Sequence, residues 1–257
     1  MPQDTPQSAP RTALITGGGR RIGRAIALAL SQAGYAVALH ANRSRADAEK
    51  LAGEITSVGG RATVVLADLA DPEALARLVP AAAVAFGPMT LLVNNASVFE
   101  EDDIGILTRA QFDATMAVNL TAPLFLAQAF AGQVDASRNA SIVNIVDQRV
   151  LRPTPKFFSY TLSKSALHLA TTTLAQALAP LRVNAVAPGP VLPSPRQNAE
   201  QFAIQAASVP LGQGPSPEDI AAAVLYLAGA KSVSGVTIAV DGGQHLAWRT
   251  ADSDVAE

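Results

Sequence analysis

The sequence predicts an α/β fold, in which a single domain is built on a doubly wound sheet of seven mainly parallel strands with helices on both faces. Three observations lead to this prediction. Short runs rich in β-branched residues alternate with longer, alanine-rich segments along the chain. The short runs are almost continuously hydrophobic, as in strands that are covered on both faces. No break in composition, linker or internal repeat divides the 257 residues, so we expect one domain.

The expected elements alternate along the chain. Strands are expected at residues 12–16, 35–40, 62–67, 91–94, 141–146, 182–187 and 236–240. Helices are expected at residues 21–33, 45–57, 72–86, 110–131, 159–179 and 218–228. Gly34 ends the first helix, a pair of glycines follows the second, and Pro72 begins the third directly after Asp71.

The composition excludes several classes of protein. The formal net charge is -2 and there is no basic run, so binding to nucleic acid or to a membrane surface is not expected. The absence of cysteine excludes disulfides, and the three histidines have no metal-ligand neighbours, so no metal is expected. Residues 1–10 lack the features of a signal peptide and are expected to form a flexible lead-in. The domain should occupy residues 11–248 of a cytoplasmic protein, with a polar tail at 249–257.

A glycine-rich segment follows the first expected strand and opens a helix. It reads Thr-Gly-Gly-Gly-Arg-Arg-Ile-Gly over residues 16–23. Glycines permit a tight turn and let the backbone approach a pyrophosphate, which then lies at the positive end of the helix. Such a turn can also merely connect a strand to a helix. Its place after the first strand favours a dinucleotide, with contacts from Thr16, Gly17, Arg20, Arg21, Ile22 and Gly23.

The end of the second strand indicates which dinucleotide is bound. After His40 the chain continues through Asn42, Arg43 and Ser44 with no carboxylate before Asp47. A carboxylate there would bind a ribose hydroxyl, whereas arginine accommodates a 2′-phosphate. Arg43 can donate two hydrogen bonds to a phosphate, and Asn42 and Ser44 can add more. A solvated basic loop is the alternative, but beside the glycine turn this segment favours NADP(H).

Tyr160 and Lys164 form a YxxxK pair, which places both side chains on one face of the expected helix 159–179. A free tyrosine is a poor acid or base at neutral pH. An ammonium group one turn away should stabilise the phenolate and lower the pKa of the tyrosine. The bare pattern is common and usually structural, but here it opens the helix that follows the fifth strand.

Together, these motifs resemble the short-chain dehydrogenase/reductase family, from about Arg11 to Leu246. The glycine turn resembles the family's TGxxxGxG turn, with Arg21 in place of its middle glycine. The family implies a Rossmann-like fold and a proton-transfer role for Tyr160 and Lys164, with Asn119 helping to hold a water-linked path from the lysine. Further cofactor contacts are implied at strand ends, namely Asp68 and Leu69, then Asn95, Ala96 and Ser97, and finally Pro188 and Gly189. The resemblance also implies a homotetramer and a substrate lid at residues 191–210.

Asp147 is the most informative departure from the family pattern. The family normally carries a serine thirteen residues before its tyrosine, where it donates a hydrogen bond to a substrate carbonyl. An ionised aspartate can only accept. It would repel the oxyanion of a ketone reduction and would suit a substrate with N–H donors or a protonated C=N group. The alternative is that Asp147 marks an active site that has lost its activity. The presence of Tyr160, Lys164 and Asn119 disfavours it.

The departures together resemble the pteridine reductase and dihydromonapterin reductase branch of the family. The resemblance rests on Arg21, the HxxRS ending of the second strand, the NNAS segment, and Asp147 with the tyrosine and lysine. It implies that NADPH reduces a dihydropterin to the tetrahydro form, with Tyr160 as proton donor. The implied substrate contacts are Arg21, Phe99, Asp147 and Tyr160. In this reading Phe99 stacks on the pterin, although a core phenylalanine would give the same pattern.

Two other functions remain open at this point. A carbonyl reductase could act on a 3-oxoacyl thioester, a sugar or another small ketone, with Asp147 incidental. The second is not an enzyme but a catalytically silent NADP-binding regulator or scaffold. Loss of Tyr160 or Lys164 would indicate such a protein, and both residues are present.

Overall fold

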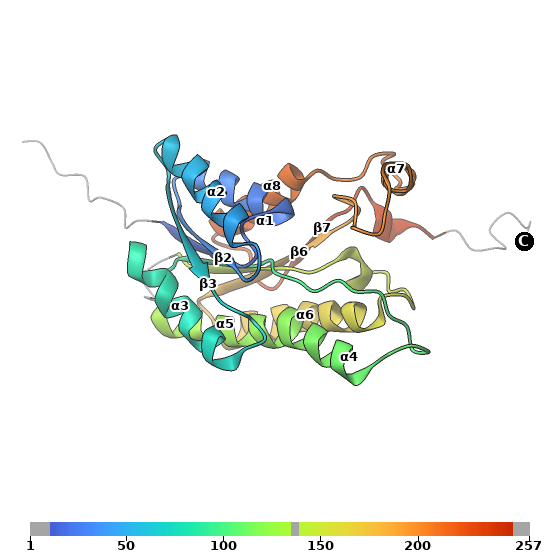
Figure 1. Cartoon of the computed structure of the whole chain (residues 1–257), viewed down its shortest axis with the longest axis horizontal. Helices are drawn as coiled ribbons and strands as arrows, with labels where there is room; N and C mark the ends of the chain where they lie inside the picture. Colours follow the sequence, from blue (N-terminus) through green and yellow to red (C-terminus); the bar gives the residue numbers. More distant parts are fainter. Residues whose placement is uncertain (1–10, 135–138, 249–257) are drawn as a thin grey trace, which may run out of the picture.

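The computed structural model describes residues 11–134 and 139–248 and has three layers (Figure 1). Seven parallel strands form one sheet in the order β3-β2-β1-β4-β5-β6-β7. Helices α1, α2 and α8 cover one face, and helices α3, α4, α5 and α6 cover the other (Figure 1). The predicted α/β fold with a doubly wound parallel sheet is confirmed.

The strands are β1 (Thr12–Ile15), β2 (Ala36–Ala41), β3 (Arg61–Leu66), β4 (Leu91–Asn94), β5 (Ser141–Ile145), β6 (Arg182–Pro188) and β7 (Thr237–Val240). The α-helices are α1 (Arg21–Gln32), α2 (Arg45–Ser57), α3 (Pro72–Phe86), α4 (Arg109–Met116), α5 (Ala122–Gln133), α6 (Phe158–Ala177), α7 (Ala199–Ala207) and α8 (Pro217–Gly229). Three short elements are the π-helical η1 (Ala117–Thr121) and the 3-10 turns η2 (Gln148–Val150) and η3 (Gln244–Leu246). The expected strands and helices all appear, with ends that differ by at most two residues.

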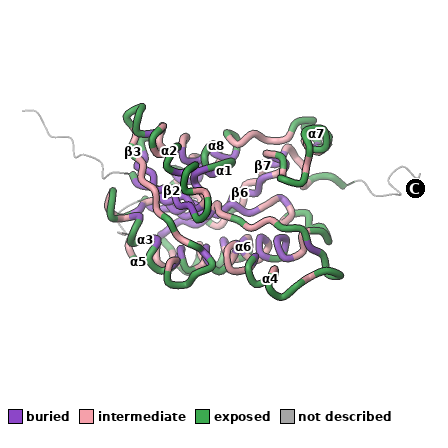
Figure 2. The backbone as a smooth tube through the Cα atoms, viewed as in Figure 1, coloured by how far each residue is buried: buried purple, intermediate pink, exposed green. Residues whose placement is uncertain are grey.

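The central strands are buried from end to end, as their continuous hydrophobic runs predict (Figure 2). The edge strands β3 and β7 are only partly covered. Two hydrophobic clusters, one on each face, fill the space between sheet and helices. The chain order reverses between β1 and β4, which lie side by side. In a doubly wound sheet, ligands bind beyond the carboxyl ends of the strands at this point.

The helix expected at residues 110–131 is a continuous helical stretch, Arg109–Gln133, with a π-helical segment in its middle. Its length and mean hydropathy of 1.3 would allow it to span a membrane. Here it packs against α3 and the sheet, with Leu126 and Phe130 fully buried in the core. The lid expected at residues 191–210 contains one element that the sequence reading did not anticipate, the helix α7.

Candidate active site

His40, at the end of β2, holds the glycine turn in place through hydrogen bonds. The backbone N–H of Gly17 donates to Nδ1 of His40 at 3.2 Å, and Nε2 of His40 lies 3.1 Å from the carbonyl oxygen of Ala67. Burial lowers the pKa of His40, so the ring is neutral at neutral pH, with Nδ1 accepting and Nε2 donating. His40 therefore ties the turn to β2 and to the end of β3.

The turn has the shape of a phosphate cradle. Gly17 has a φ of +62°, in the left-handed region that favours glycine. A side chain at Gly23 would collide with the carbonyl oxygen of Gly17 and come within 2.7 Å of Nδ2 of Asn95. The N-cap residue Arg20 makes no side-chain hydrogen bond to the first turn of α1. The N–H groups of that turn are thus left for another acceptor, which fits a pyrophosphate.

Thr16 and Asn95 join the loops that follow β1 and β4. Oγ1 of Thr16 accepts hydrogen bonds from the backbone N–H groups of Asn95 at 2.9 Å and Ala96 at 3.0 Å. Nδ2 of Asn95 donates to the carbonyl oxygens of Thr16 at 2.8 Å and Gly17 at 3.2 Å. Both side chains are engaged in these bonds, so their role in this structure is to position the backbone of the two loops.

Two arginines, Arg43 after β2 and Arg20 in the glycine turn, stand near the expected phosphate. Asn42 and Arg43 are exposed and Ser44 is half-buried. Across residues 11–134 and 139–248, no ion pair or side-chain hydrogen bond engages the guanidinium of Arg20 or Arg43. Two unpaired guanidinium groups beside the glycine turn are suited to a phosphate.

The other predicted cofactor contacts also lie near the carboxyl edge of the sheet. Oδ1 of Asp68 accepts from the backbone N–H of Ala70 at 2.9 Å. Leu69 is buried in the core, and Ile22 packs against the core on the opposite face. Gly189 follows β6, where an added side chain would press on Asp241. Pro188 ends β6, and Ser97 follows β4. Their contacts with a cofactor stay predictions.

Tyr160 and Asp147 are joined directly. The hydroxyl of Tyr160, on α6, donates to Oδ2 of Asp147 at 2.9 Å, and the tyrosine side chain is almost fully buried. Burial raises the pKa of Tyr160 well above its usual value, and the charge and hydrogen bond of Asp147 raise it further. The expectation that Lys164 makes this phenol acidic is therefore wrong for this structure, because the nearest charged partner is an anion.

Lys164 lies one turn after Tyr160 and is 2% exposed. Its Nζ donates to the carbonyl oxygen of Ile145 at 2.7 Å and lies 5.8 Å from the centroid of the Tyr160 ring. Burial lowers the pKa of Lys164 to about 8, although the charge of Asp147 acts in the opposite direction. The predicted placement of both side chains at one site is confirmed, but the ammonium group faces the backbone of β5.

Asn119 lies in the π-helical segment, fully buried. Its Oδ1 accepts from the backbone N–H of Val98 at 2.8 Å and from Oγ of Ser97 at 3.2 Å. Its Nδ2 donates to the carbonyl oxygen of Val98 at 2.9 Å and to Oγ of Ser163 at 3.1 Å. The side chain thus fastens the loop after β4 to α6. The predicted part in a water-linked proton path stays a prediction.

Phe99 stands beside Tyr160 in an aromatic group. Its ring stacks on Phe157 with centroids 4.3 Å apart and planes inclined by 9°, and it meets Tyr160 edge-on at 4.7 Å. Phe157 has a φ of +55°, which is rare for a bulky residue and marks a constrained position. One face of Phe99 is therefore covered by Phe157, and a flat substrate ring could stack only on the other face.

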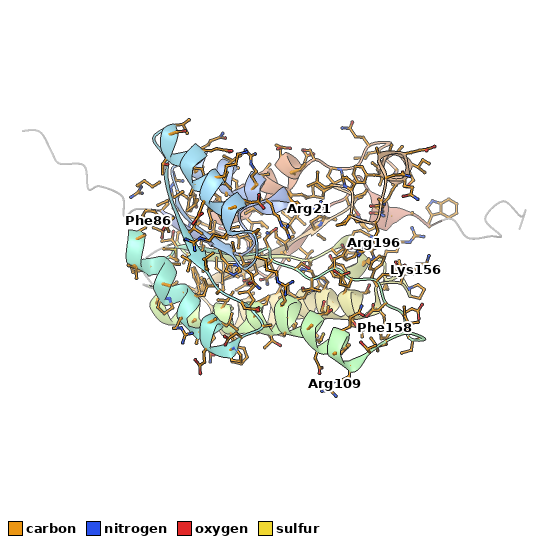
Figure 3. All side chains as sticks on the ribbon, in the orientation of Figure 1. Arg21, Phe86, Arg109, Lys156, Phe158 and Arg196 are labelled. Carbon is orange, nitrogen blue, oxygen red and sulfur yellow. The ribbon has the colours of Figure 1, made fainter. Side chains whose placement is uncertain are left out.

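Two arginines connect the lid to the rest of the site, and both are labelled in Figure 3. Arg21, at the start of α1, donates to the carbonyl oxygens of Leu192 at 3.3 Å and Pro193 at 2.9 Å. Arg196, in the lid, donates to the carbonyl oxygen of Phe99 at 2.8 Å and pairs with Glu100 at 3.1 Å. In this structure Arg21 binds the lid, and its predicted contacts with cofactor and substrate stay predictions.

Several residues of the site escaped sequence reasoning, namely Asp102, Arg149, Phe157 and Arg196. Asp102 sits in a run of four acidic residues at 100–103, yet it is 2% exposed. Its two carboxylate oxygens accept the backbone N–H of Ser159 at 3.1 and 3.3 Å, which caps α6 directly before Tyr160. Arg149 pairs with Asp147. The contacts of Asp102 and Arg196 join separate segments, so no periodicity or spacing indicates them, whereas Arg149 lies only two residues after Asp147.

Comparison with known proteins agrees with this fold. The profile described as short chain dehydrogenase matches residues 11–203. The structure of FolM alternative dihydrofolate reductase 1 from Brucella canis, complexed with NADP, is similar with a TM-score of 0.92 and 48% identity, covering 96% of this chain and 98% of that one. An oxidoreductase of Methylorubrum extorquens is 36% identical over 91% of this chain and 97% of its own length. L-xylulose reductase of Mesocricetus auratus is 34% identical over 91% and 96%.

Proposed function

The protein belongs to the short-chain dehydrogenase family, and we propose that it is an NADPH-dependent, pteridine reductase-like enzyme that reduces a dihydropterin of the dihydromonapterin or dihydrobiopterin type to its tetrahydro form. One observation carries the proposal: the hydroxyl of Tyr160 donates to the carboxylate of Asp147 at 2.9 Å. The proton donor of the site is thus aimed at an acceptor-only group that stands where the family usually has a hydroxyl.

This arrangement favours a nitrogen heterocycle over a ketone. When a ketone accepts hydride, negative charge develops on its oxygen, and Asp147 would repel that charge. When a C=N bond accepts hydride, charge develops on a nitrogen that takes up a proton. A carboxylate can accept hydrogen bonds from the neighbouring N–H groups of such a ring. Phe99 offers an aromatic face for the flat ring beside these groups.

The residues present fit NADP(H) as cofactor. The turn from Gly17 to Gly23 would hold the pyrophosphate, and Arg43 and Arg20 would hold the 2′-phosphate. When bound, NADPH supplies the hydride. The NADP in the Brucella canis structure, which covers 96% of this chain, supports this choice.

Within the site, this chain's own residues deliver and control the proton. The raised pKa of Tyr160 keeps its hydroxyl protonated at neutral pH, so the proton is available to the substrate nitrogen directly or through the Asp147 carboxylate. Lys164, with a pKa of about 8, is mostly charged at neutral pH and holds the end of β5 next to the tyrosine. Buried Asn119 fixes α6 against the loop that carries Phe99.

The test compares two classes of substrate in wild type and in Asp147→Ser. Loss of NADPH absorbance is followed with dihydromonapterin or dihydrobiopterin, and separately with a 3-oxoacyl thioester and a pentulose. We expect wild type to reduce only the dihydropterins. Asp147→Ser should lose about tenfold or more of that activity, because it exchanges an acceptor for a donor. Asp113→Ser, which alters an exposed pair with Arg109, is the matched control.

Turnover of a thioester or sugar ketone by wild type, without turnover of any dihydropterin, would replace this proposal with the carbonyl reductase. The likeness to L-xylulose reductase makes that comparison necessary. Tight NADP binding with no turnover of either class would indicate a silent binding protein.

We also propose a homotetramer located in the cytoplasm. Exposed apolar side chains on α5 and α6, including Phe125, Leu162 and Leu169, support burial of these helices in an assembly. Sedimentation at several protein concentrations tests the oligomeric state.

A further inference from the structure

Arg149 is a half-hidden cation whose polar contacts all lead to one group. Its side chain is 19% exposed, and its Nη1 lies 3.4 Å from each carboxylate oxygen of Asp147. The backbone N–H of Arg149 also donates to Oδ1 of Asp147 at 2.9 Å. Within residues 11–134 and 139–248, its guanidinium has no other polar partner, and its Nε is buried without a hydrogen bond.

An arginine that only ties secondary-structure elements together has different hydrogen-bond partners. Arg182 donates to the carbonyl oxygens of Leu227 at 2.6 Å and Ala228 at 2.8 Å, and so ties β6 to α8. Arg149 makes no such bond in the part of the chain that the structure describes. A buried unpaired N–H is unfavourable. Its position is therefore explained by Asp147 and not by the backbone.

The aromatic pair holds the guanidinium in place. The central carbon of the Arg149 guanidinium lies 5.6 Å from the centroid of Phe99 and 5.4 Å from that of Phe157. Because these distances are nearly equal, the group lies beside the stack and not on the outer face of either ring. The cation is thus fixed between the proposed substrate-stacking ring and the carboxylate.

We propose that Arg149 is a positioning residue of the catalytic centre, which holds the Asp147 carboxylate turned toward the Tyr160 hydroxyl and thereby tunes proton transfer. This inference rests on the proposed function. The carboxylate then meets the arginine, whose Nη1 is equally far from both oxygens, and the tyrosine, which donates to Oδ2. The charge of Arg149 lowers the pKa of Tyr160 and so opposes the effect of Asp147.

The other charged groups around η2 do not replace it. Lys164 on α6 is bound to the carbonyl oxygen of Ile145. His245 lies on η3, which packs against η2, and its Nδ1 is 2.8 Å from Oδ2 of Asp241. Arg196 lies 5.2 Å from the centroid of Phe99 but pairs with Glu100. Among the residues that the structure describes, Arg149 is therefore the cation paired with Asp147.

The kinetic test uses Arg149→Met and Arg149→Lys, with Arg152→Met, at an exposed arginine shortly after η2, as the matched control. The reaction is measured from tetrahydropterin and NADP across a pH series, where Tyr160 must accept the proton. We expect Arg149→Met to lower kcat about tenfold or more and to move the rising limb of the pH profile to higher pH. Arg149→Lys should restore much of both. A limb that does not move in Arg149→Met would overturn the inference.

A second measurement needs no substrate and separates this inference from the proposed function. The chain has three tyrosines, so carbon-13 labelling at Cζ gives three resonances, and Tyr160→Phe assigns the one of interest. At neutral pH, Arg149→Met and Asp147→Asn should each move the Tyr160 resonance, while Arg152→Met should not. If the Tyr160 resonance is unchanged in Arg149→Met, the positioning role of Arg149 is refuted, even if the enzyme reduces dihydropterins. A shifted resonance without dihydropterin turnover retains the role and rejects the proposed substrate.

Discussion

Replacing Lys164 with methionine should change how the stability of the protein depends on pH. Lys164 is 2% exposed, and burial lowers its pKa from the usual 10.5 to about 8. In the unfolded chain the lysine returns to its usual value. Between these two values the unfolded state binds more protons than the folded state, so the free energy of unfolding rises with pH. Below about pH 8 both states are protonated and the folded state carries the full cost of a buried charge.

The size of the effect follows from the two pKa values. The difference between 10.5 and about 8 corresponds to roughly 3 kcal/mol at 1.36 kcal/mol for each pKa unit. Methionine has no charge to bury, but it also leaves the carbonyl oxygen of Ile145 without its donor, which costs about 1–3 kcal/mol at every pH. The stability of wild type relative to Lys164→Met should therefore rise by roughly 2–3 kcal/mol between about pH 7 and about pH 10.

Urea unfolding at a fixed protein concentration, repeated over that pH range, measures this difference. Groups common to both proteins, including Tyr160, cancel in the comparison. Lys231→Met, at an exposed lysine, is the control and should run parallel to wild type. If the curves of wild type and Lys164→Met were also parallel, Lys164 would titrate near its usual value, and the account of its burial would be refuted.

Three further substitutions test the cradle, the cofactor choice and the helix cap. Gly23→Ala should weaken NADP binding at least about a hundredfold in calorimetry, because the added methyl group collides with the turn. The control is Gly53→Ala, whose methyl group meets no atom within 4 Å, and this variant should bind NADP like wild type. Arg43→Ala should reduce the preference for NADPH over NADH about ten- to a hundredfold in kcat/KM, and an unchanged ratio would assign the 2′-phosphate to other residues. Asp102→Ala should lower the free energy of unfolding by about 1–2 kcal/mol, because the N–H of Ser159 at the start of α6 loses its acceptor. Asp102→Asn should lower the free energy of unfolding by less. Equal decreases in the two variants would argue against a capping role.

The parts of the site that sequence predicts are those set by local geometry. Residues four apart on a helix share a face, so Tyr160 and Lys164 had to lie together once α6 formed. Parallel strands end at one edge of a sheet, so the loops after β1 and β4 had to meet there. Gly23 is required by the turn itself, since only glycine fits against the backbone of Gly17.

The sign of the pKa change at Tyr160 could not be predicted in this way. Spacing alone places an ammonium near the phenol and suggests a lowered pKa. In the folded chain the ammonium of Lys164 binds the backbone of β5, while Asp147 reaches the hydroxyl from the loop after that strand. Burial then acts in the same direction as Asp147. A pKa depends on which charges are near and how much water is excluded, and neither is a property of sequence spacing.

The sequence by itself determined the layered α/β architecture, the phosphate-binding turn and the family of the protein, because hydrophobic period, glycine spacing and an i, i+4 pair act over a few residues. Only the tertiary structure decided that Arg149 faces Asp147, that Asp102 caps α6, and that Phe157 covers one side of Phe99. The contacts of Asp102 and Phe157 depend on the packing of separate segments, and the Arg149 guanidinium, although only two residues from Asp147, lies beside two aromatic rings from distant parts of the chain. The physical reason is that burial and side-chain direction are set jointly by all the elements around a site, so they exist only once the chain has folded.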